Sequence, residues 1–283
     1  MRQAVLGAVL IALLSACGAS ARTRAVPSFD HVLVVVLENK SQHQVLGNRS
    51  APYFNALSKR YAVLSGYGGV THPSLPNYLA LVSGSTQGIT NDCTTCVVSG
   101  RSLADTLESA DLTWKGYAEG LPRPGFVGAF AGRYAKKHMP FLYFRDVLGS
   151  QRRLRQVVPL TQFPRDLAAG NLPSFALITP DVCHDMHSCS VATGDAWLRG
   201  FLKPLLRDPA LEDSVVFVVT DEPTSLNATA AVPALALGPL VKPGSRFRAR
   251  TSHYGLLRTI EDAWGLPHLG RSARTSPITG IWK

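Results

Sequence analysis

The chain has 283 residues, of which 46% are hydrophobic, and its formal net charge is +10 at pH 7. This length and composition suffice for one large domain with its own core, and no repeat or low-complexity segment interrupts it. The excess of positive charge indicates an anionic partner. Nucleic acid is excluded as that partner, because no aromatic-interleaved basic stripe or helix-turn-helix spacing occurs.

The first 17 residues, MRQAVLGAVLIALLSAC, have the features of a secretory signal: an arginine, a short apolar stretch and small residues before a cysteine. LSAC at residues 14–17 resembles a bacterial lipobox, in which cleavage leaves Cys17 as a lipid-carrying N-terminus. The alternative is ordinary cleavage near Ala19 or Ala21. We therefore expect an exported protein of the bacterial cell envelope, anchored to the membrane at Cys17 or otherwise periplasmic or secreted.

The domain organisation is simple. Residues 18–28, GASARTRAVPS, predict a short flexible tether, and residues 29–283 form a single domain. We make no prediction of its oligomeric state.

Short apolar runs bounded by turn-forming residues predict strands that are buried on both faces. These runs are 31–38 (HVLVVVLE), 174–181, 214–222 and 232–239. Amphipathic helical patterns lie between them, at 51–61, 102–110, 194–206 and 254–265. The alternation predicts an α/β fold with a mostly parallel sheet covered by helices on both sides, in which functional groups gather at the carboxyl ends of the strands.

The stretch THPSLPNYLALVSG, residues 71–84, places Ser74 at the start of a further helix. Pro73 and Pro76 favour an extended entry and a clean first helical turn. A serine in this position is most often an N-cap, and the alternative is a nucleophile. Taken alone, the stretch favours the cap.

Four cysteines form two close pairs, Cys93 with Cys96 and Cys183 with Cys189. In an exported protein such pairs predict two local disulfides. A zinc half-site or a redox motif at the CxxC pair is the weaker alternative, because zinc sites usually need two such halves with histidine support.

Acidic and amide side chains follow several of the predicted strands. They are Glu38 with Asn39, Asp181, Asp185 with His187, and Asp221 with Glu222. A single carboxylate after a strand is usually a helix cap. Several carboxylates brought together repel one another, so their repetition predicts a divalent cation among magnesium, calcium, manganese, iron and zinc.

Seven blocks of the chain, in order, resemble the phosphoesterase family of bacterial and fungal acid phosphatases and bacterial phospholipases C. The blocks are VVVLENKS, THPSLPNYLALVSG, YAKKHMPF, SFALITPDVCHDMHSC, GDAWLRGFL, VVFVVTDE and SHYGLLRTIEDAWGLPHLG, between about residues 29 and 271. The resemblance implies an alkaline phosphatase-like three-layer α/β/α sandwich. It also implies a metal-dependent hydrolase that cleaves phosphomonoesters through a phosphoserine intermediate.

Two alternative functions stay open at this point. One is a phospholipase C-type phosphodiesterase, which the short chain makes less favoured. The other is a non-catalytic envelope lipoprotein that binds an anionic ligand.

The resemblance assigns roles to individual residues. It places the nucleophile at Ser74, with Thr71 as the alternative, and His72 beside it to steady the phosphate. One divalent metal ion would be held by Glu38, Asn39, Ser74, Asp221 and Glu222. The substrate phosphate would meet Asn77, Asp185 and His187. His253 would protonate the leaving alkoxide, and a second metal site at Asp185, His187 and His253 is the alternative.

Several other residues receive structural interpretations. His138 lies in a matched block without a derived role. Trp197 is expected in the core, and Asp195 is expected to cap or begin its own helix. The remaining histidines are expected to be exposed or satisfied by hydrogen bonds: His31, His43, His184 and His268.

Overall fold

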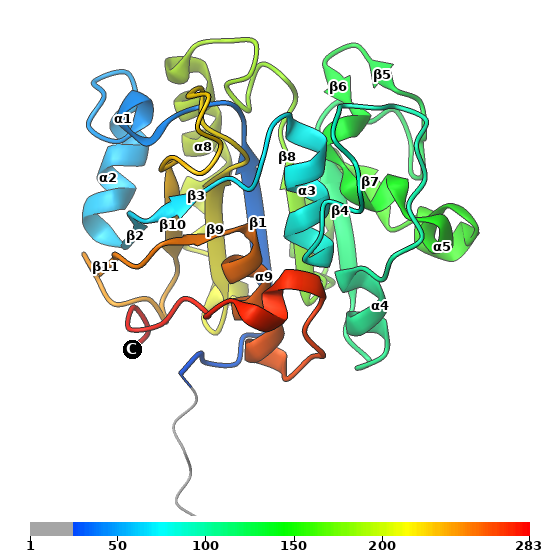
Figure 1. Cartoon of the computed structure of the whole chain (residues 1–283). Coiled ribbons are helices and arrows are strands. Elements are labelled where there is room, and N and C mark those ends of the chain that lie inside the picture. Colours follow the sequence, from blue (N-terminus) through cyan, green and yellow to red (C-terminus); the bar gives the residue numbers. More distant parts are fainter. Residues whose placement is uncertain (1–24) are drawn as a thin grey trace, which may run out of the picture.

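The computed structural model describes residues 25–283, so the predicted leader and Cys17 lie outside the described residues. The described chain is built on an eight-stranded sheet with the order β11-β2-β10-β9-β1-β8-β4-β7 (Figure 1). The strands of this sheet are β1 (Val32–Leu37), β2 (Ala62–Leu64), β4 (Trp114–Ala118), β7 (Val157–Pro159), β8 (Phe175–Thr179), β9 (Val215–Thr220), β10 (Ala234–Leu237) and β11 (Arg246–Phe247). Two small sheets pair β3 (Tyr67–Gly68) with β12 (Thr251–Ser252) and β5 (Phe130–Ala131) with β6 (Tyr134–Ala135).

The central strands of the large sheet are parallel, which confirms the mostly parallel prediction. β1 pairs in parallel with β8 and β9, and β4 pairs in parallel with β8 and β7. The predicted strand at 232–239 is β10, which runs antiparallel to β9. An antiparallel neighbour can return through a loop at the same edge, whereas a parallel one needs a long crossover.

Helices cover both faces of the sheet and complete the three layers (Figure 1). Alternate residues of β1 divide between two cores: Val32, Val34 and Val36 pack in one, and Leu33, Val35 and Leu37 pack in the other. The first core contains α3 (Ser74–Ser83) and α9 (His253–Trp264), and the second contains α2 (Pro52–Arg60) and α8 (Val191–Leu205).

The remaining helices are α1 (Gln42–Val45), α4 (Leu103–Glu108), α5 (Arg145–Leu148), α6 (Gln151–Leu154) and α7 (Phe163–Ala168). The 3-10 turns are η1 (Lys136–His138), η2 (Pro140–Tyr143), η3 (Leu160–Gln162), η4 (Pro209–Leu211) and η5 (Gly270–Arg274). Within residues 25–283, no helix has the length and apolar character that a bilayer-spanning helix needs.

The N-terminal boundary of the domain differs from the predicted one. Val26 was expected in the flexible tether, but its side chain is 3% exposed and packs in the first core. Phe29 nearby contacts Trp282 from the other end of the chain, with ring centroids 5.4 Å apart. The folded domain therefore begins before residue 29, because the apolar side chain of Val26 is buried against it.

Both predicted disulfides are present. Cys93 is bonded to Cys96, and Cys183 is bonded to Cys189. Both bonds close short loops next to the carboxyl edge of the sheet, after α3 and after β8 respectively.

Asp195 has a different role from the one expected. It lies inside α8, and its carboxylate caps the neighbouring helix α2 rather than its own helix. The backbone N–H groups of Tyr53 and Phe54 donate to its two oxygens at 2.9 and 2.7 Å. The N-cap residue of α2 is Ala51, whose side chain cannot accept a hydrogen bond. The carboxylate of Asp195 supplies what Ala51 lacks.

We predict that Asp195→Ala lowers the free energy of unfolding by about 1–3 kcal/mol, because it leaves two helix N–H groups without their acceptor. Urea denaturation measures the change. Glu212→Ala removes an exposed carboxylate and is expected to cost less than about 0.5 kcal/mol. Equal losses in the two variants would contradict the capping role.

Candidate active site

Ser74 is the first residue of α3, but it does not cap that helix. The N-cap is Pro73, which has an extended backbone and makes no side-chain capping bond. The backbone N–H of Leu75 is instead accepted by Asp92 Oδ1 at 2.9 Å, from a separate loop. The hydroxyl of Ser74 is buried and donates to Glu38 Oε2 at 2.9 Å. Of the two interpretations of Ser74, the cap is therefore wrong, and the hydroxyl faces a carboxylate.

Two acidic residues meet beside Ser74 because their strands are neighbours. Glu38 follows β1 and Asp221 follows β9, which pair in parallel up to Leu37 and Thr220. Both carboxyl groups are fully buried. Between them, Asn39 has a φ of 50°, a left-handed turn that asparagine tolerates better than most residues. This turn lets its backbone N–H donate to Asp221 Oδ1 at 3.0 Å.

Burial raises the pKa values of the carboxyl groups at this edge. The pKa of Glu38 lies well above its usual value because of burial and then because of the charges of Asp221 and Asp185. Burial raises the pKa of Asp221 and of Asp185 to about 7. The pKa of Glu222 rises to about 8 through burial, with Asp221 and Asp92 adding repulsion. Full ionisation of the cluster would therefore place more negative charge at this edge than its own surroundings stabilise.

The residues at this edge fit a bound divalent cation. The Oδ2 atoms of Asp221 and Asp185 are buried, and neither has a hydrogen-bond partner. Buried carboxylate oxygens are almost always paired. Among the described residues, Asp185 Oδ2 has only the contact with His138 Nδ1, at 3.2 Å, and Asp221 Oδ2 has no partner, so both oxygens could serve as ligands of a divalent cation. Lys40 and Lys137 are cations nearby, but their ammonium groups are engaged elsewhere. Lys40 donates to the carbonyls of Asn39 and Met186, and Lys137 donates to Asp92.

Asn77 fixes the loop that leads into α3. Its Oδ1 accepts the backbone N–H groups of Val70 and Thr71 at 2.8 and 3.2 Å. Its Nδ2 donates to the carbonyl of Thr71 at 2.7 Å and to Glu222 Oε2 at 3.1 Å. The hydroxyl of Thr71 donates to the carbonyl of His72. Because it is turned to the backbone, Thr71 is a poorer candidate nucleophile than Ser74.

His72 and Glu222 form the more open side of this site. His72 Nδ1 lies 2.9 Å from Glu222 Oε2, and its Nε2 lies 3.0 Å from the carbonyl of Ser225. The side chain of His72 is 34% exposed, in contrast to the buried Ser74.

His138 and Tyr78 belong to the site, although sequence reasoning gave neither of them a role there. His138 is buried, with Nδ1 3.2 Å from Asp185 Oδ2 and Nε2 3.5 Å from Glu38 Oε1. Burial lowers the pKa of His138 to about 3, so its ring is neutral. Tyr78 stacks on it at 5.3 Å and donates to Glu38 Oε1 at 2.5 Å. The spacing of Ser74 and Tyr78, one helical turn apart, was the available signal for Tyr78.

The residues of the possible second metal site are separated. Asp185 Oδ1 accepts the backbone N–H of His187 at 2.7 Å, so these two lie together. His253 instead contacts the backbone carbonyl of Asp221 at 2.6 Å and the hydroxyl of Tyr67 at 2.9 Å. Burial lowers the pKa of His253 to about 4. In the described chain, Asp185, His187 and His253 therefore do not converge on one point.

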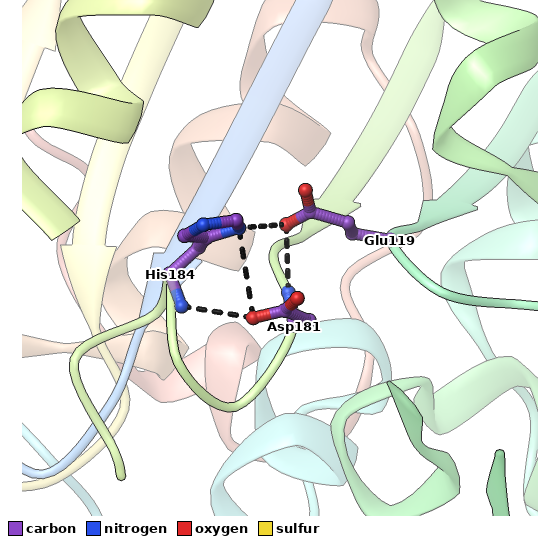
Figure 2. Close-up of side chains that lie close together, drawn as sticks. All are labelled: Glu119, Asp181 and His184. Atoms are coloured by element: carbon purple, nitrogen blue, oxygen red, sulfur yellow. Dashed lines mark hydrogen bonds and ion pairs between the residues drawn. The ribbon is translucent and has the colours of Figure 1, made fainter. Parts of the chain in front are cut away.

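A separate acidic and histidine group lies after β4 and β8 (Figure 2). Glu119, Asp181 and His184 bring one ligand atom each to within 4.8 Å of the others, an arrangement that could hold a metal ion. These atoms also satisfy one another: His184 Nδ1 lies 2.9 Å from Glu119 Oε2, which accepts the backbone N–H of Asp181 at 3.0 Å. Asp181 thus lies in this group rather than beside Ser74, and His184 is satisfied as expected.

Comparison with known proteins shows the family of this chain. Residues 44–267 match the Phosphoesterase family. Phosphatidylinositol-3-phosphatase of Mycobacterium tuberculosis is 38% identical over 261 residues, which cover 91% of this chain and 84% of that protein. An acid phosphatase of Aspergillus fumigatus is 30% identical over 256 residues, 86% of this chain but only 57% of that protein.

The fold also resembles that of solved structures. A protein of the alkaline phosphatase superfamily from Vibrio parahaemolyticus superposes with a TM-score of 0.63 at 13% identity, over 89% of this chain and 71% of that one. This likeness shows the alkaline phosphatase-like fold. Together with the family match, it identifies the chain as a member of the Phosphoesterase family, a family of hydrolases that act on phosphoric ester bonds.

Proposed function

We propose that this protein hydrolyses phosphomonoesters in two steps, with Ser74 as the nucleophile and one divalent cation at the site. Glu38, Asn39, Ser74, Asp221 and Glu222 would hold the cation. The observation that carries the proposal is the hydrogen bond from Ser74 Oγ to the fully buried Glu38, beside an Asp221 oxygen without a partner. The names of the relatives from Mycobacterium and Aspergillus, both phosphatases, support a phosphomonoester substrate.

The bound cation would lower the pKa of the Ser74 hydroxyl and neutralise charge on the transferred phosphoryl group. Glu38 Oε2 already accepts the hydrogen bond of Ser74, so it can receive the proton as Oγ attacks phosphorus. The bond from phosphorus to the leaving alkoxide then breaks, which leaves phosphoserine at Ser74. In the second step water attacks the same phosphorus and gives a proton to His72, the bond from phosphorus to Oγ breaks, Glu38 returns its proton to Oγ, and inorganic phosphate leaves.

The N-terminus of α3 favours a phosphoryl group at Ser74, because helix N-termini carry partial positive charge. Asn77 holds the entry loop in place, and the amide N–H that it now donates to Glu222 would be donated to a phosphoryl oxygen instead. Asp185 and His187 lie on the other side of Glu38 and would meet the phosphate through His187, which is exposed.

The leaving alkoxide needs a proton, and two histidines can be compared for this role. Both ring nitrogens are engaged in each of them: those of His253 by Tyr67 and the carbonyl of Asp221, and those of His72 by Glu222 and the carbonyl of Ser225. Exposure separates the two, because His253 is only 1% exposed and is closed off from a leaving alkoxide. His72 is partly exposed and lies 2.9 Å from Glu222, whose carboxylate would orient its ring. We therefore propose His72 as the general acid, with His253 holding Asp221 in place.

We predict that Ser74→Ala lowers kcat on the order of a thousandfold, because the nucleophile is lost while the phosphate site remains. Turnover of an aryl phosphate gives the rate. Acid quenching of the wild-type protein should trap phosphate on Ser74, and an added alcohol should compete with water for it. Inversion of configuration at phosphorus would show direct attack by water and would exclude the covalent intermediate.

We predict that Asp221→Asn loses bound divalent metal and turnover together, because it removes a charged ligand. Elemental analysis of the purified variant measures the metal. Asp181→Asn makes the same chemical change in the Glu119, Asp181 and His184 group and should keep both. Loss of the metal from Asp181→Asn, with retention in Asp221→Asn, would place the cation in that other group.

We predict that the stability of the metal-free protein falls as pH rises from about 6.5 to 8. Asp185, Asp221 and Glu222 have pKa values raised to about 7, 7 and 8, so the folded state holds protons that the unfolded state has released. The stability that these protons give the folded state is fully present below the pKa values of the unfolded chain. It is lost as pH rises through the pKa values of the folded protein. The neutral His138 and His253 oppose this trend only at lower pH, where unfolded histidine becomes protonated.

Thermal melts in chelator at pH 6.5 and 8 test this prediction. Added divalent cation should raise the melting temperature more at pH 8 than at pH 6.5, because it binds the ionised carboxylates. Burial also raises the pKa of Glu261 to about 7, and that part of the slope should not respond to metal. A melting temperature that rises with pH in chelator would contradict the prediction.

A further inference from the structure

Asp92 lies in the segment between α3 and α4 and caps the helix that carries Ser74. Its Oδ1 accepts the backbone N–H of Leu75 at 2.9 Å, one residue after Ser74. Pro73, the N-cap residue of α3, has no side-chain group that could do this. We propose that Asp92 is a positioning residue for Ser74: it fixes the first turn of α3, so that Oγ stays directed at Glu38. This inference rests on the proposed role of Ser74 as the nucleophile.

The loop that presents Asp92 is also held by contacts with η1 and η2. Lys137 Nζ donates to Asp92 Oδ2 at 2.8 Å, and Lys136 Nζ donates to the carbonyl of Thr94 at 3.0 Å. Further along, the backbone N–H of Val98 donates to the carbonyl of Tyr143 at 2.8 Å. The disulfide Cys93–Cys96 closes the turn between these contacts. The carboxylate of Asp92 is thus held from both sides, as a fixed acceptor requires.

The ion pair with Lys137 resolves an electrostatic conflict. A carboxylate at the N-terminus of α3 stabilises the helix, but it would repel a phosphate bound there. Lys137 is 16% exposed and lies against Asp92, so the pair brings little net charge to the phosphate site. Asp92 can therefore contribute the geometry of a cap without adding a full negative charge.

Asp195 offers a matched comparison elsewhere in the fold. It also caps, from another element, a helix whose N-cap residue cannot do so. Helix α2 carries no residue of the candidate site. Loss of either cap should lower stability, whereas only loss of the Asp92 cap should alter Ser74.

The experiment measures kcat and KM for an aryl phosphate, together with the melting temperature, for the metal-loaded full chain. Asp92→Ala is expected to lose kcat by roughly tenfold to a hundredfold, the effect of a small displacement of a reacting group, with KM little changed. Asp195→Ala should lose melting temperature and keep the wild-type kcat. Equal kcat in Asp92→Ala and Asp195→Ala would overturn the inference.

Two conservative variants separate the geometry of the cap from its charge. Asp92→Asn keeps a good N-cap acceptor without the charge, and it should retain most of the wild-type kcat. Asp92→Glu keeps the charge but displaces it by one methylene, and it should lose kcat. A loss in Asp92→Asn with full activity in Asp92→Glu would show that charge acts here, and would overturn the capping role. This pair also decides the question if Asp92→Ala does not fold.

The outcome can be told apart from a failure of the proposed function. If Ser74→Ala kept the wild-type turnover, Ser74 would not be the nucleophile and both proposals would fall. If Ser74→Ala were inactive while Asp92→Ala and Asp92→Glu turned over normally, only the role of Asp92 would be wrong.

Discussion

The burial of several carboxyl groups at one edge of the sheet, without equal positive charge, is the constraint on which the site depends. Glu38, Asp185 and Asp221 are fully buried, and Glu222 nearly so. The nearest lysines do not neutralise them, because Lys137 is paired with Asp92 and Lys40 with backbone carbonyls. His138 lies between Glu38 and Asp185 but is held neutral by burial. Such an arrangement is costly in a protein unless a cation binds there.

The fold places these groups by backbone contacts rather than by side-chain attraction. The N–H of Glu38 donates to the carbonyl of Asp185, and the N–H of Asp221 donates to the carbonyl of Leu37, both within 3.0 Å. The left-handed turn at Asn39 and the ring of His253 fix the two sides of Asp221. Mutual repulsion of the carboxylates is therefore resisted by the sheet and its extensions, and the site can keep its shape before a ligand arrives.

Much of this could be predicted from the sequence, because it depends on local pattern. Apolar runs at 31–38, 174–181 and 214–222 became the central strands, and Glu38, Asp185 and Asp221 after them came together because parallel neighbours end at one edge. Strand β4 was not predicted, since the lysine and glycine of WKGYA break the apolar pattern. The roles of His138, Asp92 and Asp195 arise from contacts between segments that are distant in the chain. The local pattern of apolar residues does not predict such contacts. Val26 was misplaced for the same reason.

The N-terminus of α3 shows why a serine there was ambiguous in the sequence. The hydroxyl of a serine before a helix ordinarily accepts a hydrogen bond from a free N–H group of the first turn. In this protein, Ser74 is already the first residue of the helix, and Pro73 occupies the N-cap position. The N–H of Leu75 is accepted by Asp92 instead. In α2 the same arrangement serves stability alone. In α3 it leaves the hydroxyl of Ser74 free to donate to Glu38, as the proposed role of this serine requires.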